Sequence, residues 1–236
     1  MTGNAKKIIA ELKHKASTEK AAFFPRFFKT GKGQYGEGDQ FIGVTVPDQR
    51  IIAKKYLEEI NEYEIKELLH SAYHESRLTG LIILSEKFKK DFKKGDGKNW
   101  VDVYLKNIDR VNNWDLVDAS APYILGPWLE KKDKSILYKF ADTNSLWRQR
   151  ISIVATFYFI KQGQINDTLS IAELLLHHEH DLIHKAVGWM LREAWKKEPG
   201  KIEKFISRHL SNMPRTMLRY AIEKMPEPQR KSYLLK

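Results

Sequence analysis

The sequence contains no cysteine. Disulfide bonds, thiolate metal sites and a cysteine nucleophile are therefore excluded. It also lacks long apolar runs: no stretch at the N-terminus resembles a signal peptide, and none is long enough to cross a bilayer. These absences predict a cytoplasmic protein that does not enter a membrane.

Several catalytic and ligand-binding motifs are also missing. No GxSxG nucleophile motif occurs, and the single glycine-rich segment, residues 31–39, matches neither GxxxxGK[ST] nor a GxGxxG that follows a strand. The run from His177 to His180 lacks the i, i+4 histidine spacing of a zinc-binding helix. A solvated loop is the better interpretation of that run, and we expect no metal and no cofactor.

Positive charge is abundant. There are 41 Lys and Arg residues against 30 Asp and Glu, giving a formal net charge of +11. This balance favours a polyanionic partner, such as nucleic acid, an anionic membrane surface or an acidic protein. Lysine-rich surfaces are nevertheless common, so a merely basic soluble protein fits the charge as well.

Almost every segment outside one loop has a helical pattern. The exception is a glycine-rich insertion at about 31–46, which should form a loop or short hairpin and ends in the strand-like run Phe41–Val46. Pro47 should then open a helix in its first turn. Long apolar helices are predicted to start near positions 75, 114, 147, 182 and 215, and a shorter helix precedes each of them.

Helix pairs recurring at about this interval are typical of an α-solenoid. We therefore predict an all-α fold in which residues 1–236 form a single domain of HEAT-like repeats. An irregular helical domain with accidental spacings is the alternative. Stacked pairs would present one helix of each pair on a concave face, which here would form a basic groove.

That predicted groove combines cations with tryptophans. Cations contact phosphates and release counterions, while indole rings pack on sugars or bases. The candidate residues are Trp114, Arg148, Arg150, Lys185, Trp189 and Arg192. In the alternative interpretation, the tryptophans belong to the core and the arginines extend to a solvated edge.

Asp118 is the carboxylate placed among these groups. It lies four residues after Trp114 and therefore projects from the same helical face. Asp115 is explained by the helix dipole, with Asn113 as a plausible N-cap, but Asp118 lies beyond the first turn. It could pair structurally with Arg150, or it could stabilise positive charge that develops on a substrate during glycosidic bond cleavage.

Three segments resemble, in order and spacing, those of the AlkD-type DNA alkylation repair glycosylases. They are Trp114-Asp115-Leu116-Val117-Asp118, Trp147-Arg148-Gln149-Arg150 and Lys185-Ala186-Val187-Gly188-Trp189-Met190-Leu191-Arg192-Glu193. Phe27-Phe28-Lys29 and Gly43-Val44-Thr45-Val46-Pro47 are similar to the N-terminal region of that family. The resemblance covers roughly residues 20–197.

The resemblance implies a HEAT-like solenoid that grips duplex DNA and excises cationic purines alkylated at N3 or N7, without a metal. It implies that Asp118 stabilises the sugar cation and positions water, that Trp114 and Trp189 pack against the deoxyribose, and that Arg150 holds a phosphate. A cationic purine is already a good leaving group, so a single carboxylate suffices. We expect such an enzyme to act as a monomer.

The sequence departs from this family at two places. Phe27 stands where the family has a DNA-contacting tyrosine, and the 31–39 insertion is longer than in the shortest members. Lys32 and Tyr35 in that insertion would enter a DNA groove, or the segment would be a simple connector. Two other functions stay open: a non-catalytic binder of duplex or branched DNA, and a protein-binding scaffold.

Overall fold

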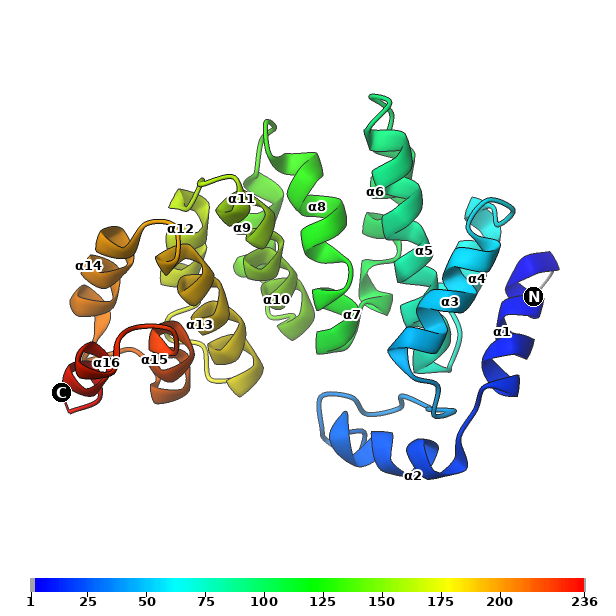
Figure 1. Ribbon diagram of the computed structural model, residues 1–236, viewed down its shortest axis with the longest axis horizontal. Coiled ribbons are helices and arrows are strands. Elements are labelled where there is room, and N and C mark those ends of the chain that lie inside the picture. The colour runs from blue at the N-terminus through cyan, green and yellow to red at the C-terminus, as the bar shows by residue number, and fades with distance from the viewer. Residues whose placement is uncertain (1–2, 236) are drawn as a thin grey trace. The chain divides into compact units, whose positions relative to one another are not determined.

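The computed structural model describes residues 3–235, and its regular structure is helical throughout (Figure 1). Within that range, β-pairing is limited to an isolated bridge between Gln40 and Tyr73. The five long helices expected from the sequence begin at His74, Trp114, Leu146, Asp181 and Arg215, each within one residue of its predicted start. The all-α prediction is confirmed.

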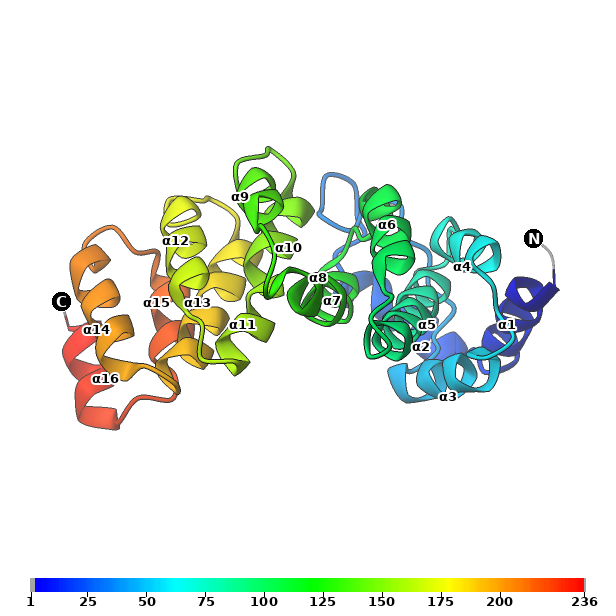
Figure 2. The same ribbon diagram turned by 90° about the horizontal axis from the view of Figure 1, so that it is seen from above.

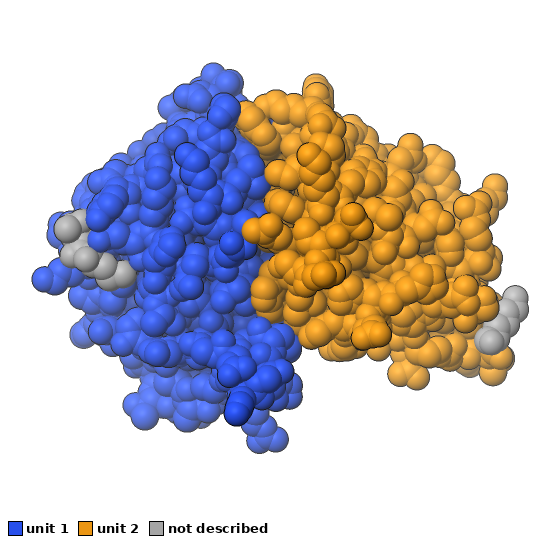
Figure 3. Space-filling model, turned by 180° about the vertical axis from the view of Figure 1, so that it is seen from behind, with its two compact units in different colours: residues 1–120 blue, residues 121–236 orange. Residues whose placement is uncertain are grey.

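The chain divides into two compact units, residues 1–120 and residues 121–236 (Figure 3). The expected single domain therefore stays a prediction. Each unit contains its own apolar core.

The first unit is built around one long helix, α5. Its elements are α1 (Gly3–His14), α2 (Thr18–Phe27), α3 (Val46–Tyr56), α4 (Glu62–Leu69), α5 (His74–Phe92), α6 (Lys98–Lys106), the 3-10 turn η1 (Ile108–Arg110) and α7 (Trp114–Asp118). Helices α3, α4, α6 and α7 all pack against α5, and α1 packs against α3 and α4. Helix α2 contributes to a shared pocket with the N-terminal ends of α3 and α5.

Local chemistry fixes the starts of α3 and α4. Thr45 caps α3 by accepting from the backbone N–H of Asp48, and Pro47 lies in the first turn, as predicted. Asn61 and Glu64 form a reciprocal capping box at α4. Both ends therefore satisfy donors that an uncapped helix would leave without partners.

The strand-like run Phe41–Val46 does not form a strand, so that prediction was wrong. The carboxylate of Glu75 accepts hydrogen bonds from the backbone N–H groups of Ile42, Gly43 and Val44, at 3.1, 2.8 and 3.2 Å to Oε1. Donors that would pair with a neighbouring strand are thus satisfied by a side chain more than 30 residues away. Gly43 has a φ of +83°, a left-handed conformation that disfavours any residue with a Cβ.

The helix predicted from Trp114 to about Glu130 is divided into α7 and α8 (Ala121–Leu129). Pro122 lacks the N–H that the carbonyl of Asp118 would need in a continuous helix. The hydroxyl of Ser120 donates to the carbonyl of Leu116 at 2.6 Å, which competes with the regular backbone pattern. Asp118 is therefore the last residue of a single-turn helix.

The second unit consists of stacked helix pairs. Its helices are α8 (Ala121–Leu129), α9 (Ser135–Ala141), α10 (Leu146–Ala155), α11 (Phe157–Lys161), α12 (Asn166–Leu174), α13 (Asp181–Trp195), α14 (Pro199–His209), α15 (Arg215–Ile222) and α16 (Glu227–Leu234). Helices α10, α13 and α15 pack in succession, α10 against α13 and α13 against α15 (Figure 2). Helix α10 also packs against the shorter helix α9, and α13 against α12 and α14. This is the arrangement expected for solenoid repeats.

The helix predicted to start near position 147 is interrupted at Thr156, whose hydroxyl donates to the carbonyl of Ile153 at 2.7 Å. Helix α16 starts after Pro226, with Pro228 in its first turn.

Candidate functional site

Helix α7 carries two of the predicted site residues, Trp114 and Asp118. Asn113 caps this helix through a hydrogen bond of 2.8 Å from the backbone N–H of Trp114 to Oδ1, as the sequence predicted. Trp114 and Asp118 are both partly exposed, while Leu116 and Val117 between them are buried. The single turn therefore packs one side into the core and presents an indole and a carboxylate at its two ends.

Trp114 belongs to an aromatic stack. The ring of Phe28 lies 5.4 Å from the indole with an interplanar angle of 14°, and Phe28 also stacks with Phe41 at 4.8 Å. His74 in turn stacks on Phe41 at 4.6 Å. Phe27, at the position of the expected DNA-contacting tyrosine, meets Trp114 edge to face at 5.9 Å and is 50% exposed. The stack holds the indole in a defined orientation.

A pocket of about 390 Å³ opens beside this stack. Its walls are almost entirely apolar and come from α2, the loop before α3, and the starts of α3, α5 and α7. The aromatic lining residues are Phe23, Phe24, Phe27, Phe28, Phe41 and Trp114. Trp114 thus borders a hollow whose lining suits the flat face of a sugar or base.

A buried charged network lies behind the aromatic wall. Nδ1 of His74 is 3.0 Å from Oδ2 of Asp39, and Nε2 is 2.8 Å from Oδ2 of Asp115. Asp39 also pairs with Arg77 through Oδ1 at 2.5 Å. Burial alone would lower the pKa of His74, but the charge of Asp115 and hydrogen bonds to Asp115 and Asp39 outweigh it and raise that pKa to about 9.

The same network sets the charge of Asp39. Burial raises the pKa of this carboxyl, but the hydrogen bond from His74 and the charge of Arg77 bring it below its usual value. Nδ2 of Asn113 donates to Asp39 as well, at 3.1 Å. The glycine-rich segment therefore ends in a carboxylate that is tied to both α5 and the N-cap of α7.

Lys32 lies near the start of the glycine-rich segment and is exposed. The segment is held by local hydrogen bonds, including Gly31 N–H to Oε1 of Gln34 at 2.9 Å and Gly33 N–H to Oε2 of Glu37 at 2.7 Å. It is an ordered turn-rich loop, and the prediction that Lys32 contacts DNA stays a prediction.

In the second unit, the two predicted phosphate ligands of α10 have different surroundings. Arg150 is 5% exposed, and its Nη1 donates to the carbonyl of Leu182 at 2.7 Å. Arg148 is partly exposed, and its guanidinium lies 6.0 Å from the ring of Phe140. Of the two, Arg148 has the more accessible guanidinium.

The three predicted residues of α13 lie on its partly exposed side. Lys185 pairs with Asp181 one turn earlier at 2.6 Å. Trp189 packs on Phe157 with ring centroids 5.6 Å apart. Arg192 pairs with Glu193 and with Glu223. The pair of Lys185 with Asp181 is exposed and therefore weak, whereas the side chain of Arg192 is only 18% exposed.

Histidines at the start of α13 have structural roles. Nδ1 of His180 accepts from the backbone N–H of Leu182 at 3.1 Å and caps the helix. His178 bonds to the side chain of Gln149 at 2.9 Å. Burial, reinforced by the neighbouring His180 and His184, lowers the pKa of His178. The run from His177 to His180 is a turn and loop, as predicted, in which His177 and Glu179 are exposed while His178 and His180 are partly buried.

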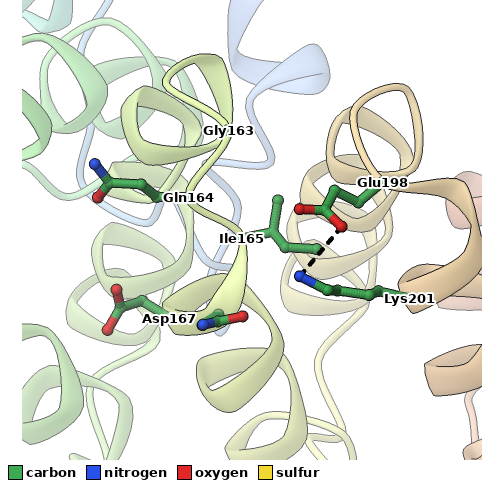
Figure 4. Close-up of a pocket in the computed structure, with 7 residues that line it drawn as sticks. Gly163, Gln164, Ile165, Asp167, Glu198 and Lys201 are labelled. Carbon is green, nitrogen blue, oxygen red and sulfur yellow. Dashed lines mark ion pairs between the residues drawn. The ribbon is translucent and has the colours of Figure 1, made fainter.

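Among residues 3–235, no group of three or more His, Asp or Glu side chains is arranged to hold a metal ion, and no helix has the length and apolar character needed to cross a bilayer. A separate polar pocket of about 300 Å³ lies where the α11–α12 connection faces the start of α14 (Figure 4). Glu198 and Lys201 form an ion pair of 3.1 Å there, and none of the predicted site residues lines it.

The residues that support α7 were not predicted from the sequence. Asp39 and His74 were not connected with Trp114 or Asp118, and Asp115 was given only a helix-dipole role. That role is present, since Oδ1 of Asp115 accepts from the backbone N–H of Leu116 at 2.9 Å. Its second oxygen makes the contact with His74. The available signal was weak: an isolated aspartate at the end of a glycine-rich segment and a histidine at a helix start.

Comparisons with known proteins agree with this architecture. A solved structure titled "Predicted DNA alkylation repair enzyme from Enterococcus faecalis" superimposes with a TM-score of 0.73, covering 90% of this chain and 98% of that one. The two sequences are 16% identical, so this likeness establishes a common fold. No curated protein matches the sequence. A family model described as "DNA alkylation repair enzyme" matches residues 8–225, which is most of the chain, and the protein therefore belongs to the DNA alkylation repair enzyme family.

Proposed function

We propose that the protein is a monofunctional DNA glycosylase that removes cationic N3- or N7-alkylated purines from duplex DNA. The observation that carries this proposal is the pairing of Trp114 with Asp118 on the single-turn helix α7. The indole is partly exposed beside an aromatic pocket, and the carboxylate ends the same turn. Membership of the family supports a role in alkylation repair.

In the proposed reaction, the N-glycosidic bond breaks and its electron pair moves to the purine nitrogen. The cationic base becomes neutral and the sugar becomes an oxocarbenium ion. Asp118 stabilises that cation electrostatically and orients a water, whose oxygen attacks C1′ and whose proton passes to solvent. The products are the free base and an abasic site.

No general acid is required for this leaving group. A neutral purine needs protonation before departure, whereas an alkylated purine already carries the positive charge that protonation would supply. One carboxylate near the sugar is therefore sufficient. Trp114 and Trp189 supply flat apolar faces for the deoxyribose, with Phe27 extending the aromatic surface next to Trp114.

We assign the contacts to the DNA phosphate backbone to cations of the second unit and of the glycine-rich segment. Arg148, Lys185, Arg192 and Lys32 are partly or fully exposed and can contact phosphates. Arg150 is the family's expected phosphate ligand, but its burial and its bond to Leu182 favour a supporting role. The partner is double-stranded DNA, bound by a monomer.

The experiment is base release from a duplex containing 7-methylguanine under single-turnover conditions. The native protein should release the base. Asp118→Asn removes the charge with almost no change of volume, and it should slow release by about a hundredfold or more while DNA affinity changes little. Asp96→Asn, at an exposed position of the same unit, is the matched control and should leave the rate unchanged.

Two outcomes would contradict the proposal. Native release that persists in Asp118→Asn would exclude Asp118 as the centre of the chemistry. Absence of release alongside salt-dependent binding to the same duplex would favour a non-catalytic DNA binder. In that case, binding to branched DNA by the native protein and by Lys32→Ala would be compared next.

A further inference from the structure

His74 bridges two carboxylates and must be doubly protonated to do so. A neutral imidazole has one N–H and one acceptor nitrogen, yet both nitrogens of His74 face carboxylate oxygens, of Asp39 and of Asp115. Both nitrogens must therefore donate. The side chain is 2% exposed, and the rings of Phe28 and Phe41 cover it at 4.9 and 4.6 Å. This is a charged, sequestered and geometrically fixed contact.

The two carboxylates belong to the two segments that frame Trp114. Asp39 ends the glycine-rich segment and also accepts from Nδ2 of Asn113, the N-cap of α7. Asp115 is the second residue of α7 and accepts from the backbone N–H of Leu116 through its other oxygen. Both ring nitrogens of His74 are thus connected with the start of α7, one through Asp39 and Asn113 and the other directly through Asp115.

Helix α7 depends on such contacts for its orientation. It has five residues, and a single helical turn has little intrinsic stability. A shift of about 1 Å in a catalytic group can lower a rate by about a hundredfold. The contact between His74 and Asp115 acts on the turn whose last residue is Asp118.

We propose that His74 is a positioning residue for base excision: bridging Asp39 and Asp115, it fixes α7 and thereby the orientation of Trp114 and Asp118. This inference rests on the proposed glycosylase function. His74 acts through α7 and does not touch the substrate. Because one arm holds the end of the glycine-rich segment, movement of that segment is also transmitted to α7.

The charge on the bridge makes the proposal testable by pH. The groups that face His74 are Asp39 from the glycine-rich segment, Asp115 from α7 and Arg77 from its own helix, while the carboxylate of the adjacent Glu75 is occupied by backbone N–H groups. Since the pKa of His74 is about 9, the bridge loses a proton as pH rises through that value. Release of the base by the native protein should therefore slow above about pH 9, while its DNA affinity in the same buffers should change no more than that of the control variant His70→Gln.

Two substitutions separate the arms of the bridge. The amide nitrogen of Gln lies near the position of Nε2 and that of Asn near Nδ1, so His74→Gln keeps a donor toward Asp115 and His74→Asn keeps one toward Asp39. We expect release to fall by about tenfold in His74→Gln and by up to about a hundredfold in His74→Asn, with no alkaline decline near pH 9 in either. His70→Gln, at an exposed histidine of the same unit, is the matched control and should behave as the native protein.

Asp115→Asn serves if the His74 variants do not fold. It keeps one oxygen that can accept from Nε2, while it removes the charge and replaces the oxygen that accepts from the backbone N–H of Leu116. It should slow release and move the alkaline decline to lower pH. Hydrogen exchange of the α7 backbone amides is measured on the same samples and should accelerate in each variant relative to His70→Gln.

The outcomes separate this inference from the proposed function. Native-like release in His74→Gln and His74→Asn would overturn the positioning role and leave the glycosylase function standing. Slower release with unchanged exchange in α7 would overturn the action through that helix, as would faster release in His74→Asn than in His74→Gln. If the native protein releases no base, the glycosylase function and the reaction role of His74 both fail, and altered exchange would then report a purely structural bridge.

Discussion

The guanidinium of Arg150 is bonded to the backbone of the following repeat: Nη1 donates to the carbonyl of Leu182 at 2.7 Å. Leu182 is the second residue of α13, whose cap is His180. Arg150 therefore links α10 to the start of α13 within the second unit. A residue that the family resemblance places on a DNA phosphate also holds two repeats together.

This contact predicts a stability defect for Arg150→Met, which keeps most of the apolar stem and removes the charge. Losing a charge-assisted hydrogen bond from a buried guanidinium should lower the free energy of unfolding by about 2 kcal/mol. Urea denaturation measures it. Arg148→Met, whose guanidinium is more accessible, should change stability by less than about 0.5 kcal/mol.

DNA binding separates the two arginines further. Each phosphate contact contributes close to one unit to the slope of log affinity against log salt concentration. Arg148→Met should therefore reduce the slope by about one unit. A similar reduction in Arg150→Met, at unchanged stability, would contradict the structural role and support direct phosphate contact.

Gly188 predicts a packing defect in the same unit. A Cβ at this position would lie 2.5 Å from both the carbonyl of Met217 and Cβ of Tyr220, so α13 and α15 approach closely because position 188 has no side chain. Gly188→Ala should lower the free energy of unfolding by about 1–3 kcal/mol. Gly200→Ala, where a Cβ meets nothing within 4 Å, should be neutral or stabilising by up to about 0.5 kcal/mol. Equal stabilities would mean that the α13–α15 contact adjusts without strain.

Helix positions were predictable from the sequence because apolar periodicity records which side of a helix faces the core. The starts of α5, α7, α10, α13 and α15 follow from it. The secondary structure departs from the prediction where one side chain or one missing N–H changes the local hydrogen bonding. Glu75 takes the backbone donors of the Phe41–Val46 run, and Pro122 ends the helix that begins at Trp114. Neither effect is visible in periodicity.

The site was predictable only as far as its residues lie in compact motifs. Trp114 and Asp118 are one turn apart, and Lys185 and Trp189 share one helix, so spacing alone groups them. Asp39, His74 and Asp115 are separated by 35 and 41 positions, and only the folded chain brings them together. Their chemistry depends on burial and on distances that sequence spacing does not encode.

The two adjacent phenylalanines of the aromatic stack should have opposite roles. Phe28 is 8% exposed and stacks on both Trp114 and Phe41, whereas Phe27 is 50% exposed and touches Trp114 at its edge. Phe28→Ala should lower the free energy of unfolding by about 3–4 kcal/mol, and Phe27→Ala by about 1 kcal/mol or less. If Phe27 contacts DNA as proposed, Phe27→Ala should still weaken binding to duplex DNA. Unchanged affinity would assign Phe27 to the pocket wall alone.

The buried bridge at His74 predicts a specific dependence of stability on pH. Its pKa in the folded protein is about 9, above the ordinary value of 6.5. Below pH 6.5 the histidine is protonated in both the folded and the unfolded chain, and the bridge contributes its full stabilisation. Between these two values the folded chain keeps the proton and the unfolded chain has lost it. Folding must then take up a proton from solvent, which becomes less favourable as pH rises. The contribution therefore declines as pH rises and is gone above about 9.

Urea denaturation at about pH 6.5 and about pH 9.5 measures this change, and His74→Gln is the reference that cancels the titration of other groups. The native protein should lose roughly 3 kcal/mol more than the variant over this interval, from about 1.4 kcal/mol for each unit of pKa displacement. A matched loss in His70→Gln and the native protein would confirm that the effect belongs to position 74. Parallel pH dependence in the native protein and His74→Gln would show that His74 is not an imidazolium at neutral pH.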